Sequence, residues 1–306
     1  MTTRREAIAA GAAFLGQSAR LAGFQAAPRT SRSKFQIGCM TLPYSPFPLQ
    51  RALEGIAKAG CRYVGWGTTH AEGGERKQVM APDAPASEAK ELAKRCRDMG
   101  LQPVMMFSGI YVDAPESIKV HTSRIQQASA AGIPFIISFG KTAPGTYEMW
   151  IQNLKQLGPV ARAAGVTLTI KQHGGNTGTG KQCSKIIADV ADEGVKMCYD
   201  SGNVLDYEKL DPIPDIQTCW RDIRSFAIKD HRVTPKNEDC APGLGEIDHY
   251  KLLAPVMRTG LTIPLICENI FEPLLRRPSQ PEGVDALARR AREFLETVIR
   301  GLETVA

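Results

Sequence analysis

One recurring pattern limits the fold of this chain more than any other feature. A short apolar run is followed by a loop and then by an amphipathic segment that ends at glycine, where the next apolar run begins at once. Glycine adopts the left-handed conformation of a helix end at little cost, so we interpret the amphipathic segments as helices and the apolar runs as strands. The glycines at these positions are Gly60, Gly100, Gly132, Gly165, Gly194 and Gly260.

The repeat predicts eight strand–helix pairs. Strands are expected near residues 35–40, 61–66, 101–107, 134–139, 166–171, 195–200, 225–229 and 261–268. Helices are expected near residues 48–59, 87–99, 115–131, 146–164, 178–193, 211–221, 248–258 and 284–300. Eight pairs in this length favour a closed parallel (β/α)8 TIM barrel, with an open doubly wound sheet as the alternative. We predict one barrel domain over residues 35–306, because no linker interrupts this region, and a separate segment over residues 1–34.

The N-terminal segment resembles a twin-arginine export signal. Arg4 and Arg5 precede a weakly apolar stretch at residues 7–16, and the small residues Ala26 and Ala27 follow. We therefore predict an exported, periplasmic protein, or a cytoplasmic one if the segment is only a tail. Because no run reaches the ~18 consecutive apolar residues of a membrane span, no stable membrane anchor is predicted.

Composition and charge narrow the class of partner. The net charge of +6 comes from basic residues scattered along predicted helices, without a basic stripe interleaved with aromatic residues, so no nucleic-acid partner is expected. The eight cysteines lie singly, without a Cys-x-x-Cys pair, which favours buried thiols, although disulfides stay open. A homo-oligomer is also left open.

Chemistry is expected at the carboxyl ends of the strands, where (β/α)8 barrels place their active sites. The fifth strand ends in Lys171, and His173 follows two residues later, so both side chains should face the same side. The second half of the barrel is the richer in ionisable groups at such positions. Its further candidates are Asp200, Asn203, Lys229, His231 and Glu268.

Other aromatic and histidine side chains have weaker claims. Trp66 and Phe107 end the second and third strands, and each suits the core as well as a platform that stacks against a sugar face. His70 follows the second strand and suits a site or a structural position equally. His121 and His249 lie on predicted helices and are expected at the surface.

Four short motifs stand in order along the last three strands and the loop between them. They are C-Y-D-S-G-N at 198–203, A-I-K-D at 227–230, G-L-G-E-I-D at 243–248 and L-I-C-E-N at 265–269. Together they resemble the xylose isomerase-like superfamily of sugar isomerases and epimerases, which also includes endonuclease IV-type barrels. The resemblance covers nearly all of residues 35–300. It implies a (β/α)8 barrel that acts on a small carbohydrate.

The resemblance also implies a metal site, and this chain departs from it. Typical members hold a divalent ion, often manganese, with a Glu ending strand five, an Asp ending strand six, a His on strand seven and a Glu ending strand eight. Asp200 and Glu268 match, but Lys171 and Ala227 take the other two positions. An ammonium group has no lone pair for a metal. We therefore expect Lys171 to replace part of the metal's charge in a Lys/Asp/Glu cluster.

A displaced metal site is the alternative. Asp200 and Glu268 could hold manganese, magnesium or zinc together with His173, His231 or both, since both histidines continue the alternation of their strands toward the mouth. No cofactor is assigned from the sequence, and a divalent metal stays open.

The function predicted from these residues and from the resemblance is that of a sugar isomerase or epimerase. It would remove a proton next to the carbonyl group of a keto sugar or polyol, with one carboxylate as base and lysines stabilising the enediolate oxygen. The predicted catalytic residues are Lys171, Asp200, Glu268 and Lys229, and Lys229 takes the substrate-contacting position of the superfamily. The predicted substrate contacts are His173, His231, His70, Trp66, Phe107 and Asn203.

Three other functions are alternatives. One is a lyase or hydrolase acting on a 3-keto sugar or glycoside. A non-catalytic, exported sugar-binding barrel would explain why two ligand positions have changed. DNA repair of the endonuclease IV type is disfavoured, because that chemistry uses a multi-metal cluster and five histidines, two of them on predicted helices, are too few.

Overall fold

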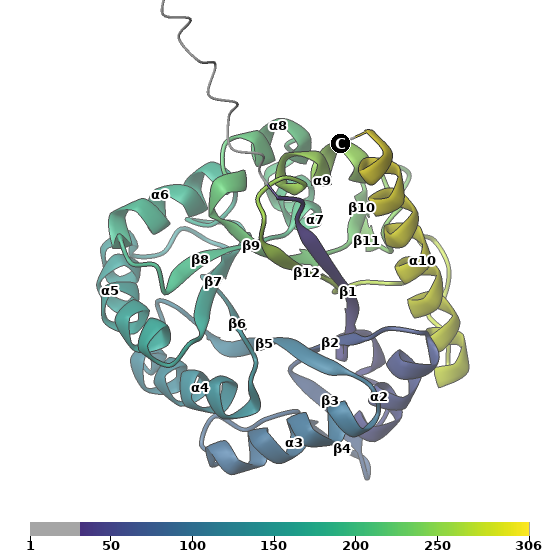
Figure 1. Cartoon of the computed structure of the whole chain (residues 1–306), viewed down its shortest axis with the longest axis horizontal. Helices are drawn as coiled ribbons and strands as arrows, with labels where there is room; N and C mark the ends of the chain where they lie inside the picture. The colour runs from purple at the N-terminus through teal and green to yellow at the C-terminus, as the bar shows by residue number, and fades with distance from the viewer. Residues whose placement is uncertain (1–30, 306) are drawn as a thin grey trace, which may run out of the picture. The chain divides into compact units, whose positions relative to one another are not determined.

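The computed structural model describes residues 31–305, and at its centre is a closed barrel of eight parallel strands (Figure 1). Around the barrel the order is β1, β2, β5, β6, β7, β8, β9 and β12. These strands are β1 (Lys34–Met40), β2 (Tyr63–Trp66), β5 (Gln102–Tyr111), β6 (Phe135–Phe139), β7 (Thr167–Lys171), β8 (Val195–Tyr199), β9 (Ile223–Ile228) and β12 (Thr262–Cys267). The (β/α)8 prediction is confirmed, and the open-sheet alternative is wrong.

Helices surround the barrel and connect successive strands (Figure 1). They are α2 (Leu49–Lys58), α3 (Ala86–Asp98), α4 (Ser117–Ala131), α5 (Tyr147–Ala163), α6 (Gly180–Val190), α7 (Ser201–Glu208), α8 (Pro212–Gln217), α9 (His249–Leu253) and α10 (Pro281–Val305). The end of α4 shows why glycine marks these boundaries. Gly132 has a φ of 69°, and its N–H donates to the carbonyl of Ala128 to close the last turn. The last helix, α10, packs against α2 and β1, so it covers the first strand–helix pair and completes the ring of helices.

The apolar core has two parts. The larger part lies between the barrel and its helices and includes Trp66, Trp150 and Leu295. The smaller part fills the barrel itself and consists of Met40, Val104, Met105, Phe107, Ile137, Cys198, Ala227 and Ile266. The barrel interior is therefore packed with side chains, and polar chemistry is confined to its mouth.

The structure differs from the predicted elements in the second half of the chain. The helix expected over residues 248–258 ends at Leu253, because Pro255 lacks the N–H that a longer helix would need, and a 3-10 turn, Ala254–Val256, follows. The helix expected over residues 211–221 is the shorter α8, followed by the 3-10 turn Trp220–Asp222.

Besides short 3-10 turns, three structural units were not predicted. Two are hairpins outside the barrel, β3 (Thr69–Glu72) with β4 (Glu75–Gln78) and β10 (Asp230–Arg232) with β11 (Glu238–Cys240). The third is α7, which begins directly after β8 because the carboxylate of Asp200 accepts a hydrogen bond from the N–H of Asn203 and so caps the helix.

Other predictions have separate outcomes. All eight cysteines are buried free thiols, as expected, and the alternative of disulfides is wrong. Within residues 31–305, no helix is long and apolar enough to cross a membrane. The arginine pair and apolar stretch of the predicted export signal lie outside the described residues, so periplasmic export stays a prediction.

Candidate active site

The barrel mouth holds two lysines and two carboxylates, here called the mouth cluster: Lys171, Asp200, Lys229 and Glu268. The Lys171 Nζ atom lies 2.6 Å from Asp200 Oδ2 and 3.1 and 3.0 Å from the two carboxylate oxygens of Glu268. The Lys229 Nζ atom lies 3.3 Å from Asp200 Oδ2 and 3.4 Å from Glu268 Oε2. Each carboxylate thus faces both ammonium groups, and the four predicted catalytic side chains come together.

The barrel topology explains this convergence. Lys171 ends β7, and the other three residues directly follow β8, β9 and β12, four strands that are consecutive neighbours in the barrel. Parallel strands in register bring their carboxyl ends to one edge, so residues far apart in the sequence meet there. The strand ends, rather than any one loop, therefore position the cluster.

Two polar side chains hold the mouth cluster in place. The side-chain oxygen of Gln172 accepts a hydrogen bond from the backbone N–H of Asp200 at 2.8 Å. The backbone carbonyl of Gln172 accepts one from the side-chain amide of Asn203 at 2.6 Å. The Asn203 Oδ1 atom accepts a hydrogen bond from Lys229 Nζ, also at 2.6 Å. The predicted residue Asn203 therefore supports Lys229, and Gln172, which was not predicted, links β7 to the start of α7.

Burial and mutual attraction set the charges of the cluster. Lys171 is 2% exposed and Asp200 is fully buried. Burial alone would lower the pKa of both lysines, but attraction by Asp200 and Glu268 overcomes it and raises the pKa of Lys171 and of Lys229. Burial would raise the pKa of Glu268, yet the two ammonium groups lower it strongly. At Asp200 burial prevails and raises the pKa to about 6.

A cavity of about 280 Å³ opens beside the mouth cluster. Lys229 and Glu268 form part of its wall, together with Asp239, and Arg277 stands above the Phe271 ring at 4.3 Å. The remaining lining residues are Leu42, Pro43, Ser45 and Asn269. A small polar molecule in this cavity would meet one carboxylate and one ammonium group of the mouth cluster directly.

His173 lies near Lys171, beside the same Phe139 ring, in agreement with the prediction that the two side chains face the same side. Its Nδ1–H donates to the Gly140 carbonyl at 3.1 Å, and its ring packs against Phe139 at 4.4 Å and Tyr207 at 5.4 Å between centroids. Burial, followed by the nearby charge of Lys171, lowers the pKa of His173. The imidazole is therefore neutral at pH 7. The Lys171 Nζ atom lies 5.8 Å from the centre of the same Phe139 ring.

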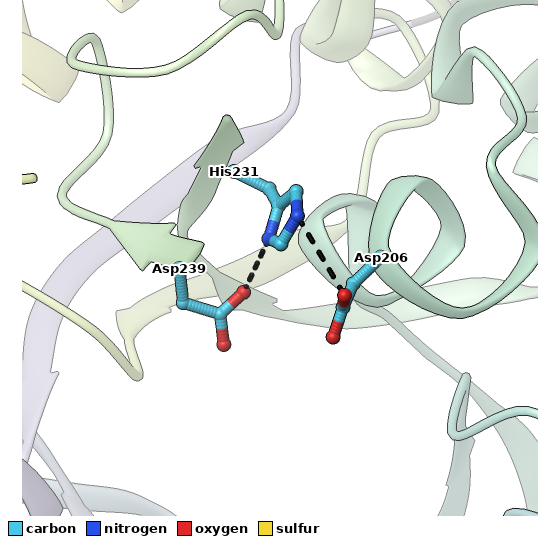
Figure 2. A group of neighbouring side chains, drawn as sticks. All are labelled: Asp206, His231 and Asp239. Atoms are coloured by element: carbon cyan, nitrogen blue, oxygen red, sulfur yellow. Dashed lines mark hydrogen bonds and ion pairs between the residues drawn. The ribbon is translucent and has the colours of Figure 1, made fainter. Parts of the chain in front are cut away.

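His231 belongs to a second group, here called the rim cluster: Asp206, His231 and Asp239. Figure 2 shows the imidazole between the two carboxylates, with His231 on β10, Asp239 on β11 and Asp206 on α7. The His231 Nδ1–H donates to Asp239 Oδ1 at 2.9 Å, and Nε2 lies 3.7 Å from Asp206 Oδ1. Burial opposes charge on His231, but the bond to Asp239 prevails and raises its pKa. Asp239 joins the two clusters, because its Oδ2 atom lies 3.1 Å from Lys229 Nζ.

Three predicted substrate contacts lie elsewhere. His70 is on the β3–β4 hairpin, where its Nδ1–H donates to the Phe47 carbonyl at 2.9 Å. Trp66 is buried in the apolar layer between the barrel and the helices, and Phe107 is packed inside the barrel with its ring edge against Phe139. For these two aromatic residues, the packing therefore supports the core role over the stacking platform.

Two histidines expected at the surface are buried instead. His121 faces β6 from α4, and its Nε2 atom accepts a hydrogen bond from the Ser138 hydroxyl at 2.8 Å; burial lowers its pKa to about 4. His249 donates from Nδ1 to the Ile247 carbonyl at 2.9 Å and packs against the Phe294 ring. The surface prediction was wrong because it considered the polarity of histidine and not the face of the helix on which each one lies.

The mouth cluster does not fit the metal site that the resemblance implies. The Lys171 ammonium group, a donor without a lone pair, holds the oxygens of Asp200 and Glu268 that would bind an ion, and Ala227 offers no ligand atom. The displaced set of Asp200, Glu268, His173 and His231 does not come together either. In the described part of the chain, only the rim cluster brings three or more His, Cys, Asp or Glu ligand atoms within 4.8 Å of one another.

Sequence reasoning missed several residues of the site. Asp239 and Asp206 lie on a hairpin strand and a helix that were not predicted, and Arg277 lies in the long loop after β12. Asp206 follows Asp200 by six residues, a spacing that would have placed it on the same helix had the Asp200 cap been recognised. No comparable signal points to Asp239, because only the folding of the hairpin returns it to His231.

The family comparison gives a clear match. A family model described as "Xylose isomerase-like TIM barrel" matches residues 53–297. No curated protein matches the chain.

Solved structures with the same fold are numerous and distant in sequence. A xylose isomerase domain protein from Planctomyces limnophilus is 17% identical, with 90% of this chain and 100% of that chain covered and a TM-score of 0.69. An L-ribulose 3-epimerase is 17% identical, with coverage of 88% and 95% and a TM-score of 0.66. A xylose isomerase-like TIM barrel protein from Mycobacterium smegmatis, solved in complex with magnesium, is 15% identical, with coverage of 86% and 97% and a TM-score of 0.66. At these identities the likeness shows the fold.

Proposed function

Because the chain belongs to the xylose isomerase-like TIM barrel family, we propose that it is a sugar isomerase or epimerase that removes the proton next to the carbonyl group of a keto sugar. One observation carries the proposal. The Glu268 carboxylate lines a cavity at the barrel mouth and lies within 3.4 Å of the ammonium groups of Lys171 and Lys229. A solved relative is an L-ribulose 3-epimerase, which supports a ketose as the class of substrate.

The proposed step moves one negative charge from the Glu268 carboxylate to the carbonyl oxygen of the substrate. Glu268 accepts the proton, the C–H bond breaks, and its electron pair moves onto the carbonyl oxygen to form an enediolate. The charge lost from Glu268 reappears on this oxygen, where Lys229, on the wall of the same cavity, stabilises it. Protonation of the same carbon by water from the other face gives an epimer, and Glu268 then releases its proton to solvent. Transfer of the Glu268 proton to the neighbouring carbon, with the hydroxyl proton passing between the two oxygens, gives an isomer.

The other two members of the mouth cluster act as positioning residues. Lys171 contacts both oxygens of Glu268 and is almost without exposure, so it fixes the carboxylate from behind. Asp200 binds both ammonium groups and balances their charge. Glu268 is a weak base while two ammonium groups hold it. A carbonyl oxygen that binds Lys229 loosens one of these contacts and strengthens the base when the substrate is present.

The proposal needs no metal ion at the mouth, and the reason is the donor set. Two ammonium groups supply there the positive charge that stabilises an enediolate, and they occupy the carboxylate oxygens that would otherwise bind an ion.

Exchange with deuterated water tests the proposed step whichever product forms. The protein is incubated in D₂O with a panel of ketoses that includes L-ribulose, and deuterium at the carbon next to the carbonyl is followed by NMR. We expect exchange with wild type and a loss of about 10²- to 10⁴-fold in Glu268→Gln, which keeps the side chain's size and removes the base. The exposed Glu91→Gln variant on α3 is the matched control and should exchange at the wild-type rate.

The same spectra separate the rival functions. An epimer or isomer keeps all its carbon-bound oxygens, whereas loss of a substituent from a 3-keto glycoside would identify a lyase or hydrolase. If no ketose exchanges while one of them raises the melting temperature of the protein, the chain is a sugar-binding barrel and the catalytic proposal is wrong.

A further inference from the structure

We propose that the rim cluster, together with Asn237, is a binding site for one divalent first-row transition-metal ion. His231 Nε2, the Asp206 carboxylate and Asn237 Oδ1 would be the protein ligands, and Asp239 would orient the imidazole. This site is distinct from the metal position that the superfamily implies at the barrel mouth. The proposal does not depend on the proposed function.

The imidazole of His231 is oriented as a metal-binding histidine would be. Its Nδ1–H donates to Asp239 Oδ1 at 2.9 Å, which fixes the ring and directs Nε2 toward Asn237 Oδ1, with which it forms a hydrogen bond. Histidine ligands in metal sites commonly donate their other ring N–H to a carboxylate in this way. His231 is only 1% exposed, so its ring direction is also set by packing.

Oxygen atoms surround Nε2 at suitable distances. Asn237 Oδ1 lies 3.2 Å from it and Asp206 Oδ1 lies 3.7 Å from it. Two ligands of a tetrahedral ion, each bound at 2.0 to 2.1 Å, are separated by about 3.3 Å. Small side-chain movements would therefore complete an arrangement of one nitrogen and two oxygens, with open positions for water. On binding, the proton on Nε2 leaves to solvent.

The three ligands come from separate elements that are held together independently of any ion. His231 and Asp239 are cross-strand partners in the β10–β11 hairpin, and Asn237 precedes β11. The Asn237 amide donates to Asp206 Oδ1 at 2.7 Å, which ties the hairpin to α7. The cluster is thus assembled before a metal arrives, so little ordering opposes binding.

The ammonium group of Lys209 lies beside the two proposed oxygen ligands. The Lys209 Nζ atom lies 2.9 Å from Asn237 Oδ1 and 3.6 Å from Asp206 Oδ1. Its side chain is 57% exposed, so it can swing into solvent when an ion binds. The buried Lys171 of the mouth cluster has no such freedom. The nearby Lys229 contacts Asp239 Oδ2, and this contact can persist, because Asp239 is not a direct ligand.

The donor set points to the class of ion. One imidazole with carboxylate and amide oxygens suits Zn²⁺, Co²⁺ or Mn²⁺ better than Mg²⁺ or Ca²⁺, which prefer oxygen ligands alone. Because Asp239 also lines the 280 Å³ cavity, an ion at the rim would lie beside the pocket of the proposed active site.

The test uses the full chain after treatment with chelator, with CoCl₂ and ZnCl₂ as probes. We expect one equivalent of Co²⁺ with a visible absorption band, and competition by Zn²⁺ in calorimetry. Asp239→Asn should weaken binding about 10- to 100-fold by releasing the imidazole, and His231→Gln or Asp206→Asn should weaken it further. Lys209→Met should strengthen it, because it removes the competing cation.

Matched controls separate the rim from other sites. His173→Gln removes the histidine on the other side of the mouth and should leave Co²⁺ affinity unchanged. Circular dichroism of each variant checks that it folds, and the gain expected for Lys209→Met cannot come from misfolding. The proposal is overturned if wild type binds no stoichiometric ion, or if the ion binds equally well to His231→Gln and Asp206→Asn. Neither result would bear on deuterium exchange at Glu268.

Discussion

Two charged groups lie side by side at the carboxyl end of the barrel and are joined through the contact of Lys229 with Asp239. The mouth cluster pairs two carboxylates with two ammonium groups, and its side chains are at most 13% exposed. The rim cluster places an imidazole between two carboxylates that are 27% and 32% exposed. Ammonium groups supply charge but no lone pair, and imidazole supplies a lone pair. At the mouth, the lysines of the chain itself provide the positive charge. At the rim, the imidazole nitrogen supports the proposal that a metal ion binds there.

Burial separates the two groups energetically as well. Charges in a buried cluster are tolerated only while each has its partners, because water cannot replace a missing one. At the rim, solvent reaches Asp206 and Asp239 and can compensate when either carboxylate loses a contact, although the His231 ring is buried. The mouth cluster should therefore be sensitive to every substitution, and the rim cluster should be tolerant of most.

The largest effect is expected from Lys171→Met. This change leaves Asp200 and Glu268 with one ammonium group between them, and we expect the free energy of unfolding in urea to fall by about 3 to 5 kcal/mol. The matched control is Lys94→Met, since Lys94 also lies 2.6 Å from a carboxylate, that of Asp98, but on the surface of α3. Because solvent screens that exposed pair, Lys94→Met should lower the free energy of unfolding far less. Equal losses in both variants would contradict the contrast.

A smaller effect is expected from the pH dependence of Asp200. Its pKa in the folded protein is raised from 3.8 to about 6, so the folded state binds this proton more tightly than the unfolded state does. Its contribution therefore favours folding near pH 4 and is lost as the pH rises through 6. Asp200→Asn keeps the cap of α7 and removes the titration.

Urea unfolding at several pH values measures this contribution. The free energy of unfolding of wild type minus that of Asp200→Asn should decrease between pH 4 and pH 6, by an amount of the order of 2 kcal/mol, and level off above pH 7. A difference that increases with pH would mean that attraction by the lysines, and not burial, controls Asp200.

The smallest effect concerns the link between the clusters. Asp239 raises the pKa of His231 through a direct hydrogen bond. Asp239→Asn should lower the pKa of His231, as followed by NMR of the imidazole protons. The pKa of His173, which burial lowers and which does not contact Asp239, serves as the internal reference. An unchanged pKa of His231 would show that packing alone sets its protonation.

The same two clusters show what a sequence can predict. Lys171, Asp200, Lys229 and Glu268 were found because strand ends converge in a (β/α)8 barrel, so position in the repeat was enough to bring them together. Asp206 and Asp239 were not found, because their approach to His231 depends on a cap and a hairpin whose turns carry no periodic signal. The barrel was predictable from period and glycine placement, and the rim was not.

Some misses had a visible cause. Pro255 stands inside the helix expected over residues 248–258, and its missing N–H ends α9 early. His121 lies four residues before Ile125 and seven before Ala128, both buried, so its face of α4 could have been read from spacing. The position of His121 would have been predicted if helical spacing had been given more weight than the polarity of the residue.

The central claim is that ammonium groups stand in place of a metal ion at the barrel mouth. Elemental analysis of the Asp206→Asn/His231→Gln double variant tests it most directly, since the rim is disabled while Asp200 and Glu268 stay intact. After dialysis against manganese, zinc or magnesium, we predict that no equivalent of metal remains bound. One equivalent that remains, and that is lost when Glu268→Gln is added, would contradict the account.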